Sequence, residues 1–128
     1  MAFSLPILML LLCSLTVAEG ELKVYDLHAE FLPFNWFGTT DGFVKVYSNM
    51  DSVGNTSVQL NDMNPTWDEE FSYPNAKEGD ILTLDVFDDD FIYDDFLGNC
   101  EEIILPGNYS NFCSLLRGGV LHYTYSFI

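Results

Sequence analysis

The side chains best suited to chemistry in this 128-residue chain are aspartates that crowd into one short segment. Within eight residues, that segment contains Asp88, Asp89, Asp90, Asp94 and Asp95. Carboxylates held this close repel one another unless a cation compensates their charge. Calcium is the natural candidate, because it is a hard cation that takes about six to eight oxygen ligands. A solvated acidic loop that binds no ion is the alternative interpretation.

The acidic segment does not have the pattern of an EF-hand. It lacks the central glycine and the terminal glutamate of that loop, and no helical pattern flanks it. If the segment binds calcium, the remaining ligands must therefore come from other loops that the fold brings close to it.

The elements that would position these loops are β-strands. Apolar side chains alternate with polar ones at Leu121, Tyr123, Tyr125 and Phe127, which is the period of a half-buried strand. Residues 82–86 repeat this pattern, and further β-rich runs lie at 22–29, 43–47, 55–59, 67–73 and 97–105. Turn-forming residues separate the runs at 41–42, 51–54, 64–65, 78–80, 106–108 and 118–119. The sequence predicts an all-β fold, an eight-stranded antiparallel β-sandwich.

The charge of the chain excludes some partners. With 4 basic and 20 acidic residues, its formal net charge is −16. Such a chain repels nucleic acid, and it repels anionic lipid unless something reverses its local sign. The aromatic content of 16% and the mean hydropathy of +0.13 argue against disorder. The basic residues form no cluster for phosphoinositide recognition; they are Lys23, Lys45, Lys77 and Arg117.

The first residues have the pattern of a secretory signal peptide. An apolar run begins at Phe3, and smaller residues end it at Ala18. A membrane anchor is the alternative, but residues 3–18 are shorter than the roughly 20 that a spanning helix needs. We therefore expect a signal peptide over 1–18, a single domain over 19–128, and a secreted, extracellular protein.

The cysteines indicate one disulfide. Cys13 would leave with the signal peptide, so Cys100 and Cys113 remain as a pair in a chain bound for an oxidising compartment. A metal site is the alternative, but it lacks partners because the two histidines, His28 and His122, lie far away in the sequence.

Two short motifs predict glycosylation. They are the sequons that begin at Asn55 and at Asn108. Either would carry a glycan only if the chain passes through a eukaryotic secretory pathway.

Four ordered segments resemble signature segments of the C2 domain family. Residues 22–32 resemble the strand that enters the family's first calcium loop, and 40–46 resemble the aspartate-led strand that leaves it. Residues 64–71 resemble the family's Asn-Pro-x-Trp-x-Glu-x-Phe segment, and 88–98 resemble its third loop. Residues 97–100, the spacing of the two cysteines and the ending at 119–125 are most similar to C2 domains of the perforin type, although the chain has no room for a pore-forming domain.

This resemblance implies a fold topology and a ligand set. The family's type II strand order is implied, because the first strand leads straight into the first loop. Asp41, Asp88, Asp90 and Asp95 match the positions of calcium ligands, and Asn35 stands where the family usually has an aspartate. Asp94 would take over or supplement the role of Asp95, and backbone carbonyls of Phe34 and Asp89 would complete the ligand shell.

The resemblance also implies membrane docking. Bound calcium would bridge the acidic loops to lipid phosphates, and apolar loop residues would enter the headgroup region. Those apolar residues are Phe34, Trp36, Phe37, Phe91, Ile92 and Tyr93. We therefore expect a monomeric module that becomes peripheral to membranes when it binds calcium.

Two other functions stay open at this stage. One is a secreted interaction module or inhibitor, in which calcium is structural and the aromatic loops bind a protein partner. The other is a small calcium-dependent lipase, which we do not expect, because the sequence has no nucleophile elbow and both histidines lie in strand patterns.

Overall fold

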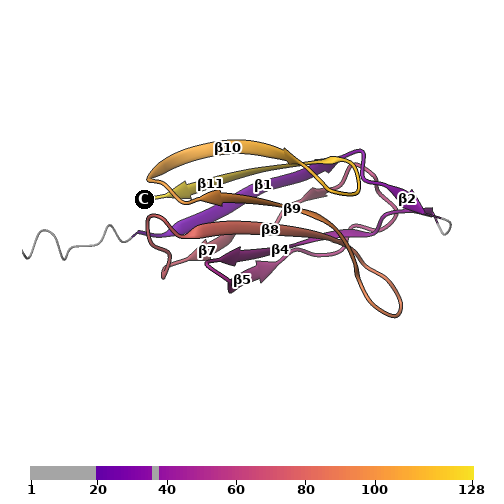
Figure 1. Cartoon of the computed structure of the whole chain (residues 1–128), viewed down its shortest axis with the longest axis horizontal. Coiled ribbons are helices and arrows are strands. Elements are labelled where there is room, and N and C mark those ends of the chain that lie inside the picture. Colours follow the sequence, from indigo (N-terminus) through magenta and orange to yellow (C-terminus); the bar gives the residue numbers. More distant parts are fainter. Residues whose placement is uncertain (1–19, 36–37) are drawn as a thin grey trace, which may run out of the picture.

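The computed structural model describes residues 20–35 and 38–128 (Figure 1). The predicted signal peptide, residues 1–18, lies outside the described residues, as do Trp36 and Phe37. No helix in the described part of the chain is long and apolar enough to cross a bilayer.

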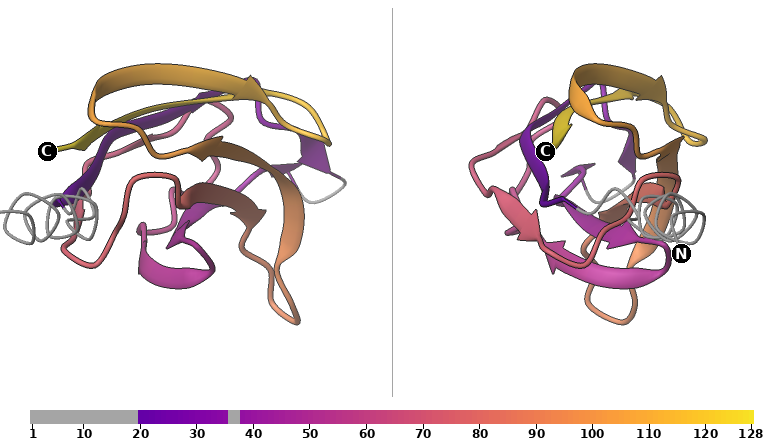
Figure 2. Two further views of the ribbon diagram at one scale, coloured as in Figure 1. Left: turned by 60° about the vertical axis from the view of Figure 1, so that its left-hand side comes forward. Right: turned by 90° about the vertical axis from the view of Figure 1, so that its left-hand side faces the viewer.

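The described residues form two antiparallel sheets that face each other (Figure 2). One sheet has the order β5-β4-β8-β9, and its strands are Asp51–Asn55, Gly42–Ser48, Ile81–Asp88 and Asp95–Ile103. The other has the order β10-β11-β1-β6, with β7 also paired to β1. Its strands are β10 (Gly107–Ser114), β11 (Val120–Phe127), β1 (Leu22–Glu30), β6 (Thr66–Trp67) and β7 (Phe71–Tyr73). A separate short hairpin joins β2 (Phe34–Asn35) to β3 (Gly38–Thr39).

This architecture confirms the predicted antiparallel β-sandwich. The described residues form eleven strand segments in place of the expected eight. The surplus has a simple origin: β6 and β7 are successive parts of one edge along β1, and the β2–β3 hairpin lies inside the loop that follows β1. As the type II order implies, β1 leads directly into that loop.

The core lies between the sheets and follows the predicted alternation. In β1, Leu22 and Val24 are buried and Lys23 between them is exposed. In β11 the alternation is seen only up to Tyr123, because Thr124 and Ser126 are buried together with Tyr125 and Phe127. Trp67 closes the core near the acidic end, where its indole N–H donates a hydrogen bond to the Gly42 carbonyl at 3.2 Å. The core therefore fixes the first residue of β4, which follows Asp41.

The prediction of a strand over 55–59 is wrong. The chain turns at Asn49 and Met50, whose φ angles are 51° and 73°, so the strand begins earlier, at Asp51. Residues predicted to form the turn therefore pair with β4. After Asn55 the chain keeps contact with β4 through the Thr56 N–H, which donates to the Val44 carbonyl at 2.9 Å, and through an isolated bridge between Gly42 and Gln59.

Strand β10 was not predicted. It is an edge strand that pairs along its whole length with β11, and most of its residues are exposed. Its Asn and Ser residues give no alternating apolar pattern, so the sequence offers a turn signal at its start and no strand signal after it.

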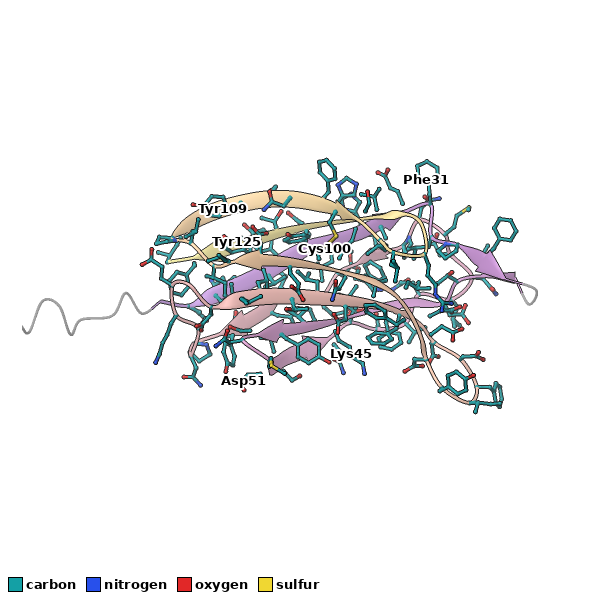
Figure 3. All side chains as sticks on the ribbon, in the orientation of Figure 1. Phe31, Lys45, Asp51, Cys100, Tyr109 and Tyr125 are labelled. Atoms are coloured by element: carbon teal, nitrogen blue, oxygen red, sulfur yellow. A yellow bond between two sulfur atoms is a disulfide. The ribbon has the colours of Figure 1, made fainter. Side chains whose placement is uncertain are left out.

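The predicted disulfide is confirmed. Cys100 of β9 and Cys113 of β10 are bonded, with their Cα atoms 5.8 Å apart (Figure 3). Because β9 and β10 belong to different sheets, the bond ties one layer of the sandwich to the other.

Candidate calcium site

Loops that are distant in the sequence meet at one end of the sandwich. Figure 1 shows the β2–β3 hairpin and the loop from β8 to β9 at the end opposite the C-terminus, and the β8–β9 loop projects from the body as a finger. The view in the left half of Figure 2 shows the same projection. We call this end, made of residues 31–35, 38–41, 56–65, 88–95 and 115–119, the acidic tip.

Asp41 and Asp88 form the centre of the acidic tip. The Asp41 N–H donates a hydrogen bond to Asp88 Oδ1 at 2.9 Å, and the Asp89 N–H donates to the Asp41 carbonyl at 2.8 Å. In the sheet, Asp88 lies opposite Gly42 on β4 and opposite Asp95 on β9. The end of β8 therefore places Asp88 between two acidic neighbours from different strands.

Other loops brace this centre. The Asn61 N–H donates to Asp41 Oδ1 at 2.7 Å, which ties the connection between β5 and β6 to the first loop. The Thr40 hydroxyl donates to the Pro33 carbonyl and joins the two arms of the first loop. The bond from Asn61 holds the Asp41 carboxylate in place. The sequence did not predict a role for Asn61.

Burial and repulsion act together on Asp88. Its exposed fraction is only 8%. Loss of hydration raises the pKa of its carboxyl, and the nearby charges of Asp41, Asp95 and Asp90 raise this pKa further, against the lowering effect of the Asp41 N–H. A carboxylate with a raised pKa gains from a nearby cation, because the cation favours its charged form.

The remaining aspartates lie on the finger, where they are more exposed. The Asp90 N–H faces Asp94 Oδ1 at 3.4 Å, and the Phe91 N–H donates to Asp90 Oδ1 at 2.6 Å. Desolvation, a hydrogen bond with Asp94, and the charges of Asp94, Asp41 and Asp90 raise the pKa of the Asp89 carboxyl. The charges of the finger and of the tip centre therefore act on one another.

The donor set fits a hard cation. Asp41, Asp88 and Asp95 bring carboxylate oxygens from different strand ends, and oxygen is the ligand atom that calcium prefers. Their carboxylate oxygens do not all lie close enough together to contact one ion. Among the described residues, the group of ligand side chains that lies within 4.8 Å includes none of these aspartates. The position of Asn35 in β2 places it in the first loop, but its side chain lies outside the described residues.

Apolar side chains surround the acidic tip. The predicted residues Phe34, Phe91, Ile92 and Tyr93 are all largely exposed, and Phe91 and Ile92 stand at the end of the finger. Trp36 and Phe37 cannot be placed, since they lie outside the described residues. Three further exposed residues of the tip were not predicted: Phe31, Leu60 and Leu116 (Figure 3 labels Phe31). None of the three is adjacent in the sequence to a predicted ligand, so only the fold shows that they lie at the tip.

Arg117 was also missed as a residue of the tip. It lines a small pocket of about 160 Å³ together with Pro33, Phe34, Thr40, Asp88, Asp95 and Leu97. Its N–H donates to the Leu97 carbonyl at 2.9 Å, which fixes the β10–β11 turn beside the acidic centre. A single cation at this place offsets only a small part of the acidic charge.

The two sequons lie away from the acidic centre and are accessible. Asn55 ends β5 and Asn108 lies near the start of β10, and both are exposed. Asn108 donates from Nδ2 to the Tyr25 hydroxyl at 2.8 Å. Glycosylation at either residue stays a prediction.

Comparison with known proteins decides the family. Residues 20–104 match the C2 domain family. The chain belongs to that family. This C2 domain is 30% identical to human perforin-1 over 102 residues, which are 77% of the chain but only 18% of perforin-1. The predicted likeness to perforin is thereby confirmed.

Solved structures agree with this assignment. A protein described as a C2 domain superposes with a TM-score of 0.83 at 44% identity, covering 84% of this chain and 97% of that one. The first C2 domain of a plant extended synaptotagmin 1 gives a TM-score of 0.75 at 22% identity, covering 84% and 93%. A calcium-bound structure of two C2 domains of extended synaptotagmin 2 gives 0.74 at 20% identity, covering 85% and 45%. The last two share the fold with this C2 domain.

Proposed function

We propose that this C2 domain is a secreted module that binds phospholipid membranes when calcium occupies its acidic tip. The observation that carries the proposal is the convergence of Asp41, Asp88 and Asp95 at the tip centre, where crowding and burial raise the pKa of Asp88. Exposed apolar side chains surround that centre, so one end of the molecule combines a cation site with a surface suited to lipid.

The calcium ligands would be oxygens of the tip. Asp88 and Asp41 form the centre, Asp95 lies opposite Asp88 on β9, and Asp90 and Asp94 would join them from the adjoining finger. Asn35 and the carbonyls of Phe34 and Asp89 are further candidates from the adjoining loops. Calcium, when bound, supplies positive charge and coordination positions that phosphate oxygens can fill.

The chain itself supplies a surface that enters the headgroup region. With a net charge of −16, the protein as a whole repels an anionic bilayer. Compensation of the tip charge removes this repulsion only there, and Phe34, Phe91 and Ile92 can then reach the interface. The proposal therefore assigns calcium dependence to the aspartates and much of the binding energy to the apolar rim.

Similarity to known proteins supports the proposal and also limits it. The calcium-bound extended synaptotagmin 2 structure is of the same fold, and human perforin-1 contains a segment related to this C2 domain. Since the chain spans 18% of perforin-1, the activity of that whole protein is not assigned to it.

Vesicle sedimentation tests the proposal. We expect the protein to sediment with phosphatidylserine-containing vesicles in millimolar calcium and to stay in the supernatant in EDTA. The double variant Asp88→Asn, Asp90→Asn should need at least about tenfold more calcium for half-binding, because it removes two anionic ligands. The control variant Glu78→Gln, Glu101→Gln makes the same charge change at exposed residues outside the tip and should bind as the wild type does.

Several results would contradict the proposal. Unchanged calcium dependence in the aspartate double variant would show that the site is elsewhere. A protein that binds calcium in solution but never sediments with vesicles would favour the interaction module with a protein partner. Turnover of labelled phospholipid by the purified protein would show an enzyme instead of a binding module.

A further inference from the structure

A second group of metal-ligating side chains lies away from the acidic tip, on the outer face of the sheet that contains β1 and β11. Ligand atoms of His28, Glu30 and His122 lie within 4.8 Å of one another. His28 and His122 are directly opposite each other on neighbouring strands, and their rings stack with centroids 4.4 Å apart and planes 5° from parallel. Glu30 Oε1 lies 3.6 Å from His122 Nε2.

A β-bulge in β1 brings these side chains to one face. Between the pairs Tyr25–Thr124 and His28–His122, β1 advances by one residue more than β11. Asp26 takes a positive φ of 53° at this place. Leu22 and Val24 point into the core before the bulge, and Leu27 and Ala29 do so after it. Without the extra residue, His28 and Glu30 would fall on the core side of the strand, so the bulge creates the cluster.

The surroundings of the cluster favour a cation. His28 and His122 line a hollow of about 610 Å³ on the sheet, and its wall also contains Asp26, Asp68 and Glu70 but no Lys or Arg. Acidic side chains around a hollow raise the local concentration of cations. The side chains of His122 and Glu30 are 31% and 48% exposed, so an ion can reach them from solvent.

The ligand atoms are close enough to share one ion once the stacked rings rotate, because imidazole lone pairs lie in the ring planes and parallel rings do not point at one ion. Two ligands of a tetrahedral zinc ion lie about 3.3 Å apart, given Zn–N and Zn–O distances of about 2.0 to 2.2 Å. The Glu30–His122 pair is already close to this separation, and partly exposed side chains can rotate to close the rest. Phe112 packs against His122 with ring centroids 5.6 Å apart, which limits how far the imidazole can swing away.

We propose that His28, Glu30 and His122 form a binding site for a late first-row divalent metal ion such as zinc. Two imidazole nitrogens and one carboxylate suit such an ion, whereas calcium prefers oxygen ligands alone. Three protein ligands leave a fourth coordination position for water or for a ligand from outside. None of the three proposed ligands belongs to the acidic tip, and Glu30 directly precedes its first residue, Phe31.

Calorimetric titration with zinc, in millimolar calcium to saturate the acidic tip, tests this proposal on the untagged protein. We expect one zinc ion to bind per chain. Because His28 and His122 are the only two histidines, the imidazole signals of an NMR spectrum should both shift as zinc is added. His28→Gln and His122→Gln should each weaken zinc binding by about a hundredfold or more, and Glu30→Gln by about tenfold.

A charge-matched control separates ligation from general attraction. Asp68→Asn removes one negative charge from the hollow without removing a proposed ligand, so zinc affinity should stay within a few-fold of the wild type. The thermal transition of each variant in the absence of zinc checks that it is folded. Full zinc affinity in the folded double variant His28→Gln, His122→Gln, or an equal loss in Asp68→Asn, would overturn the proposal.

Discussion

At the scale of single residues, Asp88 is an acidic side chain of the acidic tip that is both buried and close to other negative charges. It is buried at the end of β8, opposite Asp95 on β9 and hydrogen-bonded to Asp41, which directly precedes β4. The Asp41 N–H stabilises its charged form only in part, since the net shift of its pKa is upward. An asparagine can accept the same hydrogen bond without carrying the charge.

The raised pKa of Asp88 predicts how stability depends on pH when calcium has been removed. Because the folded-state pKa lies above the ordinary value of 3.8, the folded protein takes up the proton before the unfolded chain does. Stability should therefore rise as the pH falls from neutral, and the gain should stop near the ordinary pKa of 3.8. Thermal unfolding of calcium-stripped protein across this range measures the effect.

Asp88→Asn serves as the comparison for this pH series. At neutral pH it should be more stable than the wild type by about 1 kcal/mol without calcium, because the substitution removes the crowded charge. The stability of this variant should also rise less than that of the wild type as the pH is lowered. If wild type and variant change equally with pH, the effect belongs to other groups, Asp89 first among them.

At the scale of elements, periodicity predicted those strands whose one face is buried. The strands β1, β4, β8, β9 and β11 lie where alternation or β-rich composition indicated them, since each contributes apolar residues to the core. Edge strands were harder, because they bury less: β5 was displaced and β10 was missed. The bulge at Asp26 could not be foreseen, since nothing in the local sequence marks where β1 gains a residue relative to β11.

The candidate site was predictable to a similar degree. The acidic segment and Asp41 were identified from residue type and family pattern, and the structure brings Asp41, Asp88 and Asp95 together. Asn61 and Arg117 come from connections far away in the sequence, so only the fold shows that they reach the tip. His28 and His122 were considered only as partners for the two cysteines, and only the fold shows that they are direct cross-strand neighbours.

Strand β9 begins with an irregular segment that depends on Gly98. Val86 pairs with Gly98 and Phe87 with Phe96, so Leu97 is an extra residue in β9. Gly98 has a φ of 142°, and a Cβ there would lie 2.5 Å from the Leu116 backbone nitrogen. This close approach holds the β10–β11 turn, with Arg117, against the base of the finger.

Gly98→Ala should therefore destabilise the domain by more than backbone strain alone. We expect the free energy of unfolding, measured by chemical denaturation, to fall by about 3 kcal/mol or more. Gly118→Ala is the matched control: its φ of 115° is also positive, but a Cβ there meets nothing within 4 Å. It should cost only about 1 kcal/mol. Equal losses in the two variants would contradict the role of the close approach.

At the scale of the whole molecule, the two ends of the sandwich are chemically different. The acidic tip gathers aspartates and exposed apolar residues, and the opposite end carries both the β4–β5 and β9–β10 turns and the C-terminus (Figure 1). Against a total charge of −16, a few compensated carboxylates at the tip change the sign of a small region only. This asymmetry would orient the molecule with the strands pointing toward the membrane, and it leaves the outer sheet face with His28 and His122 accessible.

The disulfide adds a covalent link between the two sheets, which also pack on each other through the core. The bond between Cys100 and Cys113 joins the two sheets and closes a loop with a sequence separation of 13. Replacing both residues by alanine should lower the free energy of unfolding by about 3 kcal/mol, because the unfolded chain gains conformational entropy when the loop is no longer closed. The thermal midpoint should fall by roughly 10 °C or more.

This substitution also tests whether the tip is built independently of the cross-link. Both cysteines lie away from the hydrogen bonds that hold Asp41 and Asp88, so calcium-dependent vesicle sedimentation below the lowered midpoint should match that of the wild type. A variant that keeps its thermal midpoint would show that sheet packing alone holds the layers together. A variant that stays folded but no longer sediments would show instead that the link between β9 and β10 positions the finger, because β9 begins where the finger ends.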